Sequence, residues 1–187
     1  MGYLNVNTVQ NTSGRSLAGV TGTIVDSYYI SSFAQYNILC TTGDGTRIPD
    51  LVLTVTPKRT TNVIMCEWNL SGEIDNNTLF TVFKKVGSGS WGLITTAGEQ
   101  GYNNSIGNVN YSGISPGWYD GDFSSTPANN VMNYSFVAGT TSKIDIGLAL
   151  RNPNGGTNNF VNRTNSSWGQ ASYETTMSYA YLFEIYA

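Results

Sequence analysis

The sequence contains no histidine, and charged residues make up only 11% of the chain. Without histidine, Ser-His-Asp and Cys-His catalytic arrangements and His-ligated metal sites are excluded. The formal net charge of −3 argues against nucleic-acid and anionic-membrane partners, because both bind basic surfaces. With so few charges, the polar surface must be built from Asn, Ser, Thr and Gly.

Long apolar runs are also missing. No stretch of 18 apolar residues occurs, so we expect no membrane-spanning helix. The first residues lack the basic start and apolar centre of a signal peptide, which predicts a protein made in a host cytoplasm and kept there until assembly. Cys40 and Cys66 both lie in apolar, strand-like runs, where buried free thiols are expected, although a disulfide remains an alternative.

Paired carboxylates are the one serious catalytic route that remains, since glycosidases use two Asp or Glu residues. Glu67, Glu73 and Asp75 are the densest acidic group, but the intervening Ser71-Gly72 resembles a turn and nothing fixes their separation. We interpret them as ordinary surface or turn acids. We therefore predict no catalytic residues and no cofactor.

Three further acids could offer oxygen ligands to calcium. Asp44 lies in Thr-Gly-Asp-Gly, and Asp120 and Asp122 lie in Tyr-Asp-Gly-Asp-Phe. Calcium takes six to eight oxygen ligands, and no further acids accompany these residues. Turn formation explains both places, so we predict no metal site.

The clearest pattern in the chain is the alternation from Tyr173 to Ile185, which predicts a β-strand. The alternation places Tyr179, Tyr181 and Phe183 on one face, which we expect to fill the core. Leu182 interrupts the polar face. With Tyr186, it is expected on the surface and is our candidate for a subunit interface.

Similar strand patterns recur through the chain and are separated by Gly-, Asn- and Asp-rich turns. They cover residues 23–30, 34–41, 51–56, 61–70, 78–86, 91–96, 131–138, 143–150 and 159–164. This spacing, with no helical period, predicts an all-β fold, an antiparallel jelly-roll-like β-sandwich. In it, Ile144, Ile146, Leu148 and Leu150 should face the core.

The first residues differ from the rest of the chain. The segment around Leu4, Val6 and Val9 alternates only briefly before a glycine-rich connector, so it cannot form a core alone. We predict an N-terminal arm for particle attachment over residues 1–22, with Leu4, Val6 and Val9 as attachment residues. Residues 23–187 then form the sandwich body.

The tract from Gln100 to Asn130 interrupts the regular strand spacing. It is rich in Gly and Asn, and a loop of this length is usually functional or partly structured. Trp118 and Tyr119, within it, are candidates for surface recognition, because flat aromatic faces can stack on sugar rings. Trp91 and Trp168 could do the same, with core packing as the alternative.

Both ends of the chain resemble a known family. The opening, Leu4-Asn-Val-Asn-Thr-Val-Gln-Asn-Thr-Ser-Gly14, resembles a segment that begins many structural proteins of tailed bacteriophages. The close, Asn162-Arg-Thr-Asn165 followed by Ser178-Tyr-Ala-Tyr-Leu-Phe-Glu-Ile185, is similar to the ending of trimeric jelly-roll domains on phage fibres and head decorations. Asn7 and the Met-Ser-Tyr run at 177–179 depart from that pattern.

This resemblance implies a non-enzymatic virion structural protein that assembles as a homotrimer. The expected role is a capsid decoration or cement protein that binds the major capsid protein or another virion component. A tail-fibre or receptor-binding tip is one alternative, with a host surface glycan as a further partner. The other alternative is an independent carbohydrate-binding module.

Overall fold

The computed structural model describes residues 22–40, 43–94, 101–102, 111–117, 127–164 and 174–187, which form strands joined by turns. Within these ranges, no helix is long and apolar enough to cross a membrane. The strands are β1 (Ile24–Ser32), β2 (Tyr36–Leu39), β3 (Thr46–Val55), β4 (Val63–Glu73), β5 (Leu79–Val86), β6 (Gly92–Leu93), β7 (Gly101–Tyr102), β8 (Tyr111–Ser112), β9 (Ser115–Pro116), β10 (Ala128–Val137), β11 (Ile144–Arg151), β12 (Asn158–Val161) and β13 (Ser178–Ile185).

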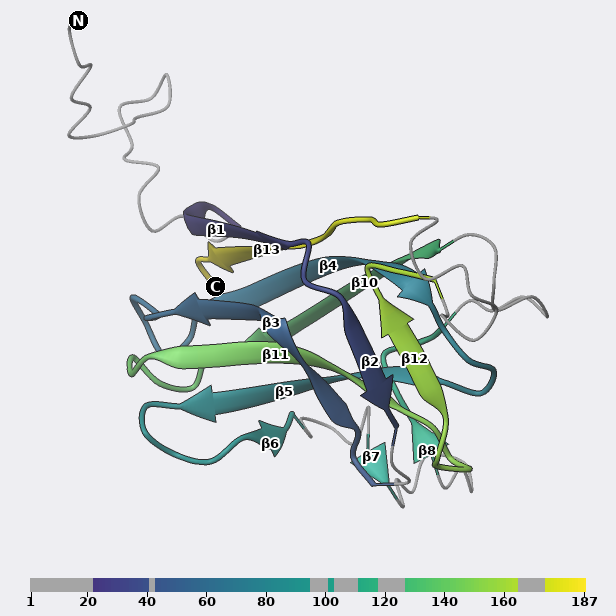
Figure 1. The fold of residues 1–187 in the computed structure, drawn as a ribbon. Coiled ribbons are helices and arrows are strands. Elements are labelled where there is room, and N and C mark those ends of the chain that lie inside the picture. Colours follow the sequence, from purple (N-terminus) through teal and green to yellow (C-terminus); the bar gives the residue numbers. More distant parts are fainter. Residues whose placement is uncertain (1–21, 41–42, 95–100, 103–110, 118–126, 165–173) are drawn as a thin grey trace, which may run out of the picture.

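Two antiparallel sheets pack face to face (Figure 1). In the first sheet, β13 lies between β1 and β4, and β10 pairs with β4 along its length. The short strands β12 and β2 extend this sheet beyond the end of β13. The second sheet has the order β3-β11-β5-β6, with β9 also paired to β5.

The chain crosses repeatedly from one sheet to the other. Strands β1, β4, β10 and β13 belong to the first sheet, while β3, β5 and β11 alternate with them in the second. The first and last strands are neighbours. This winding is that of a jelly roll, so the predicted all-β, jelly-roll-like antiparallel sandwich is confirmed.

The core lies between the sheets. Trp68 of β4 is fully buried and donates a hydrogen bond from Nε1 to the carbonyl oxygen of Leu51, 3.3 Å away. From β11, Ile144, Ile146 and Leu148 pack into the same cluster, as the alternation in their sequence predicts. Burying one such aliphatic side chain contributes about 1.5–3 kcal/mol to folding, so this cluster supplies much of the driving force.

Asn162, from the Asn-Arg pair noted in the sequence, closes one corner of the sandwich. Its backbone has a φ of 59°, and its Nδ2 donates to the carbonyl oxygens of Ser32 and Ala34, each 2.9 Å away. Its Oδ1 accepts a hydrogen bond of 2.6 Å from Ser178, whose hydroxyl in turn accepts one from the backbone N–H of Ser71. The Asn162 amide therefore joins the β1–β2 connection to β13, and Ser178 carries the link on to β4.

The predicted orientation of the last strand is wrong. Leu182 is fully buried and belongs to the core, whereas Tyr181 is 36% exposed and Tyr179 and Phe183 are half-buried on the outside. Leu182 is therefore not available for a subunit contact. Tyr186 is half-buried, and its ring packs under the guanidinium of Arg59 in the same chain, 4.7 Å from Cζ to the ring centroid.

The reversed orientation can be tested with Leu182→Ala and Tyr181→Ala. Leu182→Ala leaves a cavity in the core and should lower the free energy of unfolding by about 2–5 kcal/mol. Tyr181→Ala removes a partly exposed cross-strand contact and should cost about 1 kcal/mol or less. Urea denaturation followed by circular dichroism measures both values. Equal losses, or a larger loss for Tyr181→Ala, would contradict this orientation.

Candidate functional site

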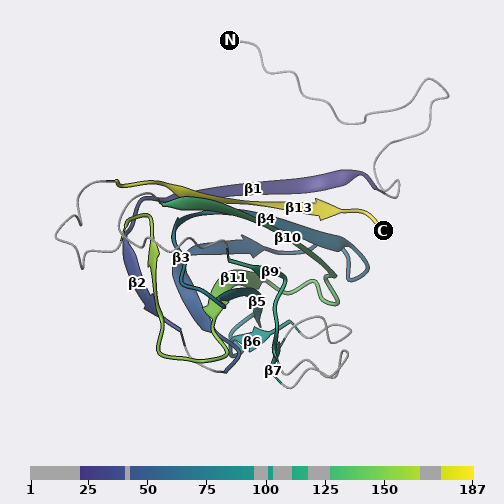
Figure 2. The same cartoon turned by 90° about the vertical axis from the view of Figure 1, so that its right-hand side faces the viewer.

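The first sheet presents one face to the core and one away from it, as Figure 2 shows along the length of β1, β13, β4 and β10. We call the side chains that point away the outer face. On β4, β10 and β13 they alternate with buried residues, and on β1 they alternate with half-buried ones. They are Ile24, Ser27, Tyr29, Ser31, Val63, Met65, Glu67, Asn69, Asn129, Val131, Asn133, Ser135, Val137, Tyr179, Tyr181, Phe183 and Ile185.

The strand register arranges this face in rows. The central row runs Tyr29, Tyr181, Glu67 and Asn133 across β1, β13, β4 and β10. The rings of Tyr29 and Tyr181 lie 4.9 Å apart between centroids, within the range for interacting aromatic pairs. Tyr181 also lies 5.7 Å from Tyr179 in an edge-on arrangement, so the rings form a continuous cluster over β1 and β13.

Phe183 and Asn69 extend this cluster along the strands. The ring of Phe183 lies 6.3 Å from that of Tyr181 and nearly parallel to it. Asn69 of β4 donates a hydrogen bond of 2.9 Å from Nδ2 to the hydroxyl of Tyr179, which fixes the direction of that ring. The aromatic rings are thus held in place by their own chain.

Apolar side chains dominate the surface of these strands. Of the eight large hydrophobic residues that are exposed in the described part of the chain, five belong to them: Ile24, Tyr29, Val131, Val137 and Tyr181. Glu67 is the one charged residue of the outer face. A contiguous, aromatic and almost uncharged surface is typical of a contact with another macromolecule.

The second sheet has a different outer surface. Trp91 lies over β11, with the guanidinium of Arg47 4.1 Å from its ring centroid and the ammonium of Lys85 5.5 Å away. Gly147 leaves room for this arrangement, because a Cβ atom there would come within 2.8 Å of Arg47 Cδ. Trp91 therefore packs on the outside of the sandwich, and cations of its own chain lie over its ring.

Beside Trp91, the buried carboxylate of Asp145 gathers three donors. Lys85 and Lys143 approach it at 2.9 and 3.2 Å, and the hydroxyl of Thr54 donates to it at 2.8 Å. Burial by itself would raise the pKa of Asp145. The hydrogen bonds from Lys85, Thr54 and Lys143 outweigh burial and lower the pKa of this carboxyl below its ordinary value.

Glu67 lies far from Glu73, the next of the acids singled out in the sequence. Glu67 and Glu73 both lie on β4, and their separation of six residues in an extended strand is about 20 Å. Paired glycosidase carboxylates lie about 5–9.5 Å apart, so these two are too far from each other. Asp75 follows in the turn after β4, where its N–H donates to the side chain of Asn159.

No group of three or more Cys, Asp or Glu residues that could hold a metal is found in the described residues. Asp44 is exposed in the turn between β2 and β3, and its carbonyl oxygen accepts a hydrogen bond from the Thr81 hydroxyl. Asp120 and Asp122 lie outside the described residues, as do Trp118, Tyr119 and Trp168. The predicted attachment residues Leu4, Val6 and Val9 are also outside them.

Both cysteines are free and buried, as expected. Burial raises the pKa of Cys40 to about 12 and also raises the pKa of Cys66. Neither sulfur is therefore a nucleophile at neutral pH. Cys40 Sγ instead accepts a hydrogen bond of 3.0 Å from Asn159, within the polar network at one end of the sandwich.

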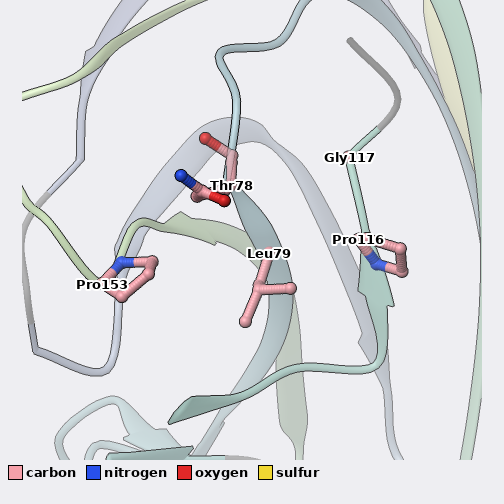
Figure 3. Close-up of a pocket in the computed structure, with 6 residues that line it drawn as sticks. Thr78, Leu79, Pro116, Gly117 and Pro153 are labelled. Carbon is pink, nitrogen blue, oxygen red and sulfur yellow. The ribbon is translucent and has the colours of Figure 1, made fainter.

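A small open pocket of about 310 Å³ lies near the start of β5 (Figure 3). Leu79, Pro116 and Pro153 give it apolar walls, and Thr78 adds a polar edge. Gly117 is required beside it, because a Cβ atom there would overlap the side chain of Ile74. Its lining has no charged group, and the Thr78 hydroxyl donates to the side-chain oxygen of Asn159, so the lining supplies no base that would activate a nucleophile.

The sequence analysis did not identify the outer face, because it assigned the aromatic row of the last strand to the core. Tyr29, Tyr179, Tyr181 and Phe183 are the residues missed. The other row of the last strand gave no usable signal. It contains Ser178 and Glu184, which can be buried only with hydrogen-bond partners, and the sequence does not identify those partners.

No protein-family profile and no curated protein matches the sequence. Among solved structures, the chain is similar to VP2 in a subviral particle of infectious bursal disease virus, with a TM-score of 0.41, 9% identity, and coverage of 86% of this chain and 32% of that one. It is also similar to a structure of the Gx strain of that virus, with a TM-score of 0.39, 8% identity, and coverage of 98% and 38%. The chain thus spans about a third of the length of these structures.

The ion-pair cluster predicts a specific pH dependence. Because the pKa of Asp145 is lowered by folding, its ionised form stabilises the protein above its unfolded pKa of about 3.9, and this contribution is lost as the pH falls through the lower folded pKa. Asp145→Asn should therefore be less stable than wild type at neutral pH, with a difference that shrinks below about pH 4. Urea titrations of both proteins across this range measure it, and a constant difference would contradict the assignment.

The separation of the carboxylates predicts that Glu67 has no catalytic role. Glu67→Gln should leave the protein folded, and neither the variant nor the wild type should hydrolyse neutral or acidic polysaccharides in a reducing-end assay. Turnover by the wild type that disappears in Glu67→Gln would instead identify a glycosidase.

Proposed function

We propose that this protein is a non-enzymatic structural protein of a bacteriophage virion, which decorates and cements the capsid as a homotrimer. The observation that carries the proposal is the outer face of the first sheet, an apolar surface on a jelly roll whose acids are dispersed. A surface of this kind suits assembly, whereas an enzyme needs convergent reactive groups.

The scarcity of charge supports the same function. With so few charged residues, the body has little electrostatic repulsion to keep copies apart, and net charge is one of the means by which proteins remain monomeric. Association that covers the aromatic rings of β1 and β13 would remove their apolar surface from water. The partners in this proposal are further copies of the chain and the major capsid protein or another virion component.

In this proposal the two segments of the chain have different roles. Residues 1–22 attach the protein to the particle, through Leu4, Val6 and Val9, and residues 23–187 form the body. The described body is closed by its own contacts, since Gly22 donates a hydrogen bond of 2.7 Å to the Tyr186 carbonyl oxygen and the Tyr186 N–H donates to Thr23. Gly22 thus already pairs with the body, and a deletion that preserves this contact ends at Thr21.

A deletion of residues 1–21 tests this function. The shortened protein should remain β-rich by circular dichroism, because the core cluster is built from residues after Gly22. It should no longer sediment with phage heads that lack this protein, whereas the full chain should do so. A matched control is Leu4→Ala with Val6→Ala in the full chain, which should weaken sedimentation without altering the body. Sedimentation of the shortened protein equal to that of the full chain would contradict an attachment role for the arm.

A further inference from the structure

The outer face is larger and more apolar than the isolated body requires. Its tyrosines stabilise the pairing of β1 with β13, but Val131 and Val137 on β10 are each 56% exposed and make no such contribution. We propose that the outer face is the surface through which three copies of the chain pack around a threefold axis. This inference rests on the proposed homotrimer and assigns the surface that forms it.

The chemistry of the face favours another copy of the chain over a charged partner. Interface centres are enriched in Tyr, Phe and Met and depleted in charge, and the outer face carries Tyr181, Phe183 and Met65 with Glu67 as its one charge. A basic or strongly acidic partner would find almost no complementary charge here. The surface that matches this one in polarity is the same face on another copy.

The width of the sheet fits three copies. Strands lie about 4.8 Å apart and packed sheets about 10 Å apart, so the side chains of each sheet fill about 5 Å. We call the first sheet of each copy a wall of the trimer. Three such sheets, each about 5 Å from a common axis, enclose a triangle with sides of about 17 Å. The four strands β1, β13, β4 and β10 with their margins span about 19 Å, which closes such a triangle without a large central void.

This arrangement fixes which residues meet. Because β1 and β10 are the outermost of the four strands, β1 of one copy approaches β10 of the next at each corner. Tyr29, 52% exposed, lies in the row of Asn133, and Val131, 56% exposed, is the next outward-facing residue of β10 along this corner. The row of Tyr181 and Glu67 lies in the middle of the wall and faces the axis.

Glu67 is the residue that opposes assembly. In a face-to-face pair, two copies would seal this carboxylate between dry sheets, which is costly without a charge partner. Around a threefold axis, the Glu67 carboxylates of the three copies point toward the axis, where they repel one another. The charge of Glu67 therefore weakens the association, and its removal should not weaken the trimer.

Light scattering on the full chain, with circular dichroism on the same samples, tests the inference. The wild type at micromolar concentration should show three times the chain mass of 20.2 kDa. Val131→Asp places a charge at each corner and should raise the dissociation constant of the trimer by about tenfold or more, with an unchanged β-rich spectrum. Leu39→Asp is the matched control, because Leu39 is 54% exposed but lies on β2, outside the four strands, and it should remain trimeric.

Glu67→Gln supplies an independent measurement. Removing the charge that faces the axis should leave the dissociation constant unchanged or lower it. A weaker trimer would show that Glu67 pairs with a cation on a different surface of the neighbouring copy, and the proposed packing would be wrong.

The remaining outcomes separate this inference from the proposed function. A trimeric wild type whose Val131→Asp variant is equally trimeric would overturn the interface and leave the homotrimer in place. A monomeric or dimeric wild type would overturn the threefold packing, while sedimentation with phage heads would still decide whether the protein is a virion component.

Discussion

The orientation of β13 depends on two polar side chains that are fully buried at its two ends. Ser178 bonds to Asn162 at one end, and at the other the Glu184 carboxylate accepts hydrogen bonds of 2.6 Å from the N–H of Lys58 and from the Asn62 side chain. A shift of the strand register by one residue would turn both side chains to the outer face. Their partners would then remain buried without these hydrogen bonds. The partners therefore determine which row of the last strand faces inward, and the outer face follows from that choice.

This constraint explains what could be predicted from the sequence and what could not. Alternation along the chain identified nearly every long strand, and Ile144, Ile146 and Leu148 were placed correctly because their strand offers one apolar row. In β13 both rows have apolar members, so local hydrophobicity favoured Tyr181 over Leu182. The contacts that decide which row faces the core come from Lys58, Asn62 and Asn162, outside the strand. The alternation of residues within β13 cannot reveal these contacts.

The two sheets divide the charge of the molecule unequally. Outside the second sheet, Asp145 binds two lysines, and the cations of Arg47 and Lys85 lie against Trp91. On the outer face of the first sheet, Glu67 is the one charge among aromatic, aliphatic and small polar side chains. Charged groups keep the outside of the second sheet hydrated. The outer face of the first sheet is stabilised by contact with another apolar surface. The asymmetry thus gives the sandwich one face suited to solvent and one suited to assembly.

The aromatic cluster on the first sheet has a role within the body as well. Strand β1 is an edge strand, held on one side by β13, and exposed edges invite pairing with other chains. Cross-strand aromatic pairs contribute about 0.2–1 kcal/mol each, so Tyr29 against Tyr181 helps to keep β1 in register. Substitutions of these tyrosines change both the strand pairing and any contact with a neighbouring copy. Val131 on β10 is separated from these rings by Asn69, its partner on β4, and its substitution therefore disturbs the pairing of β1 with β13 less directly.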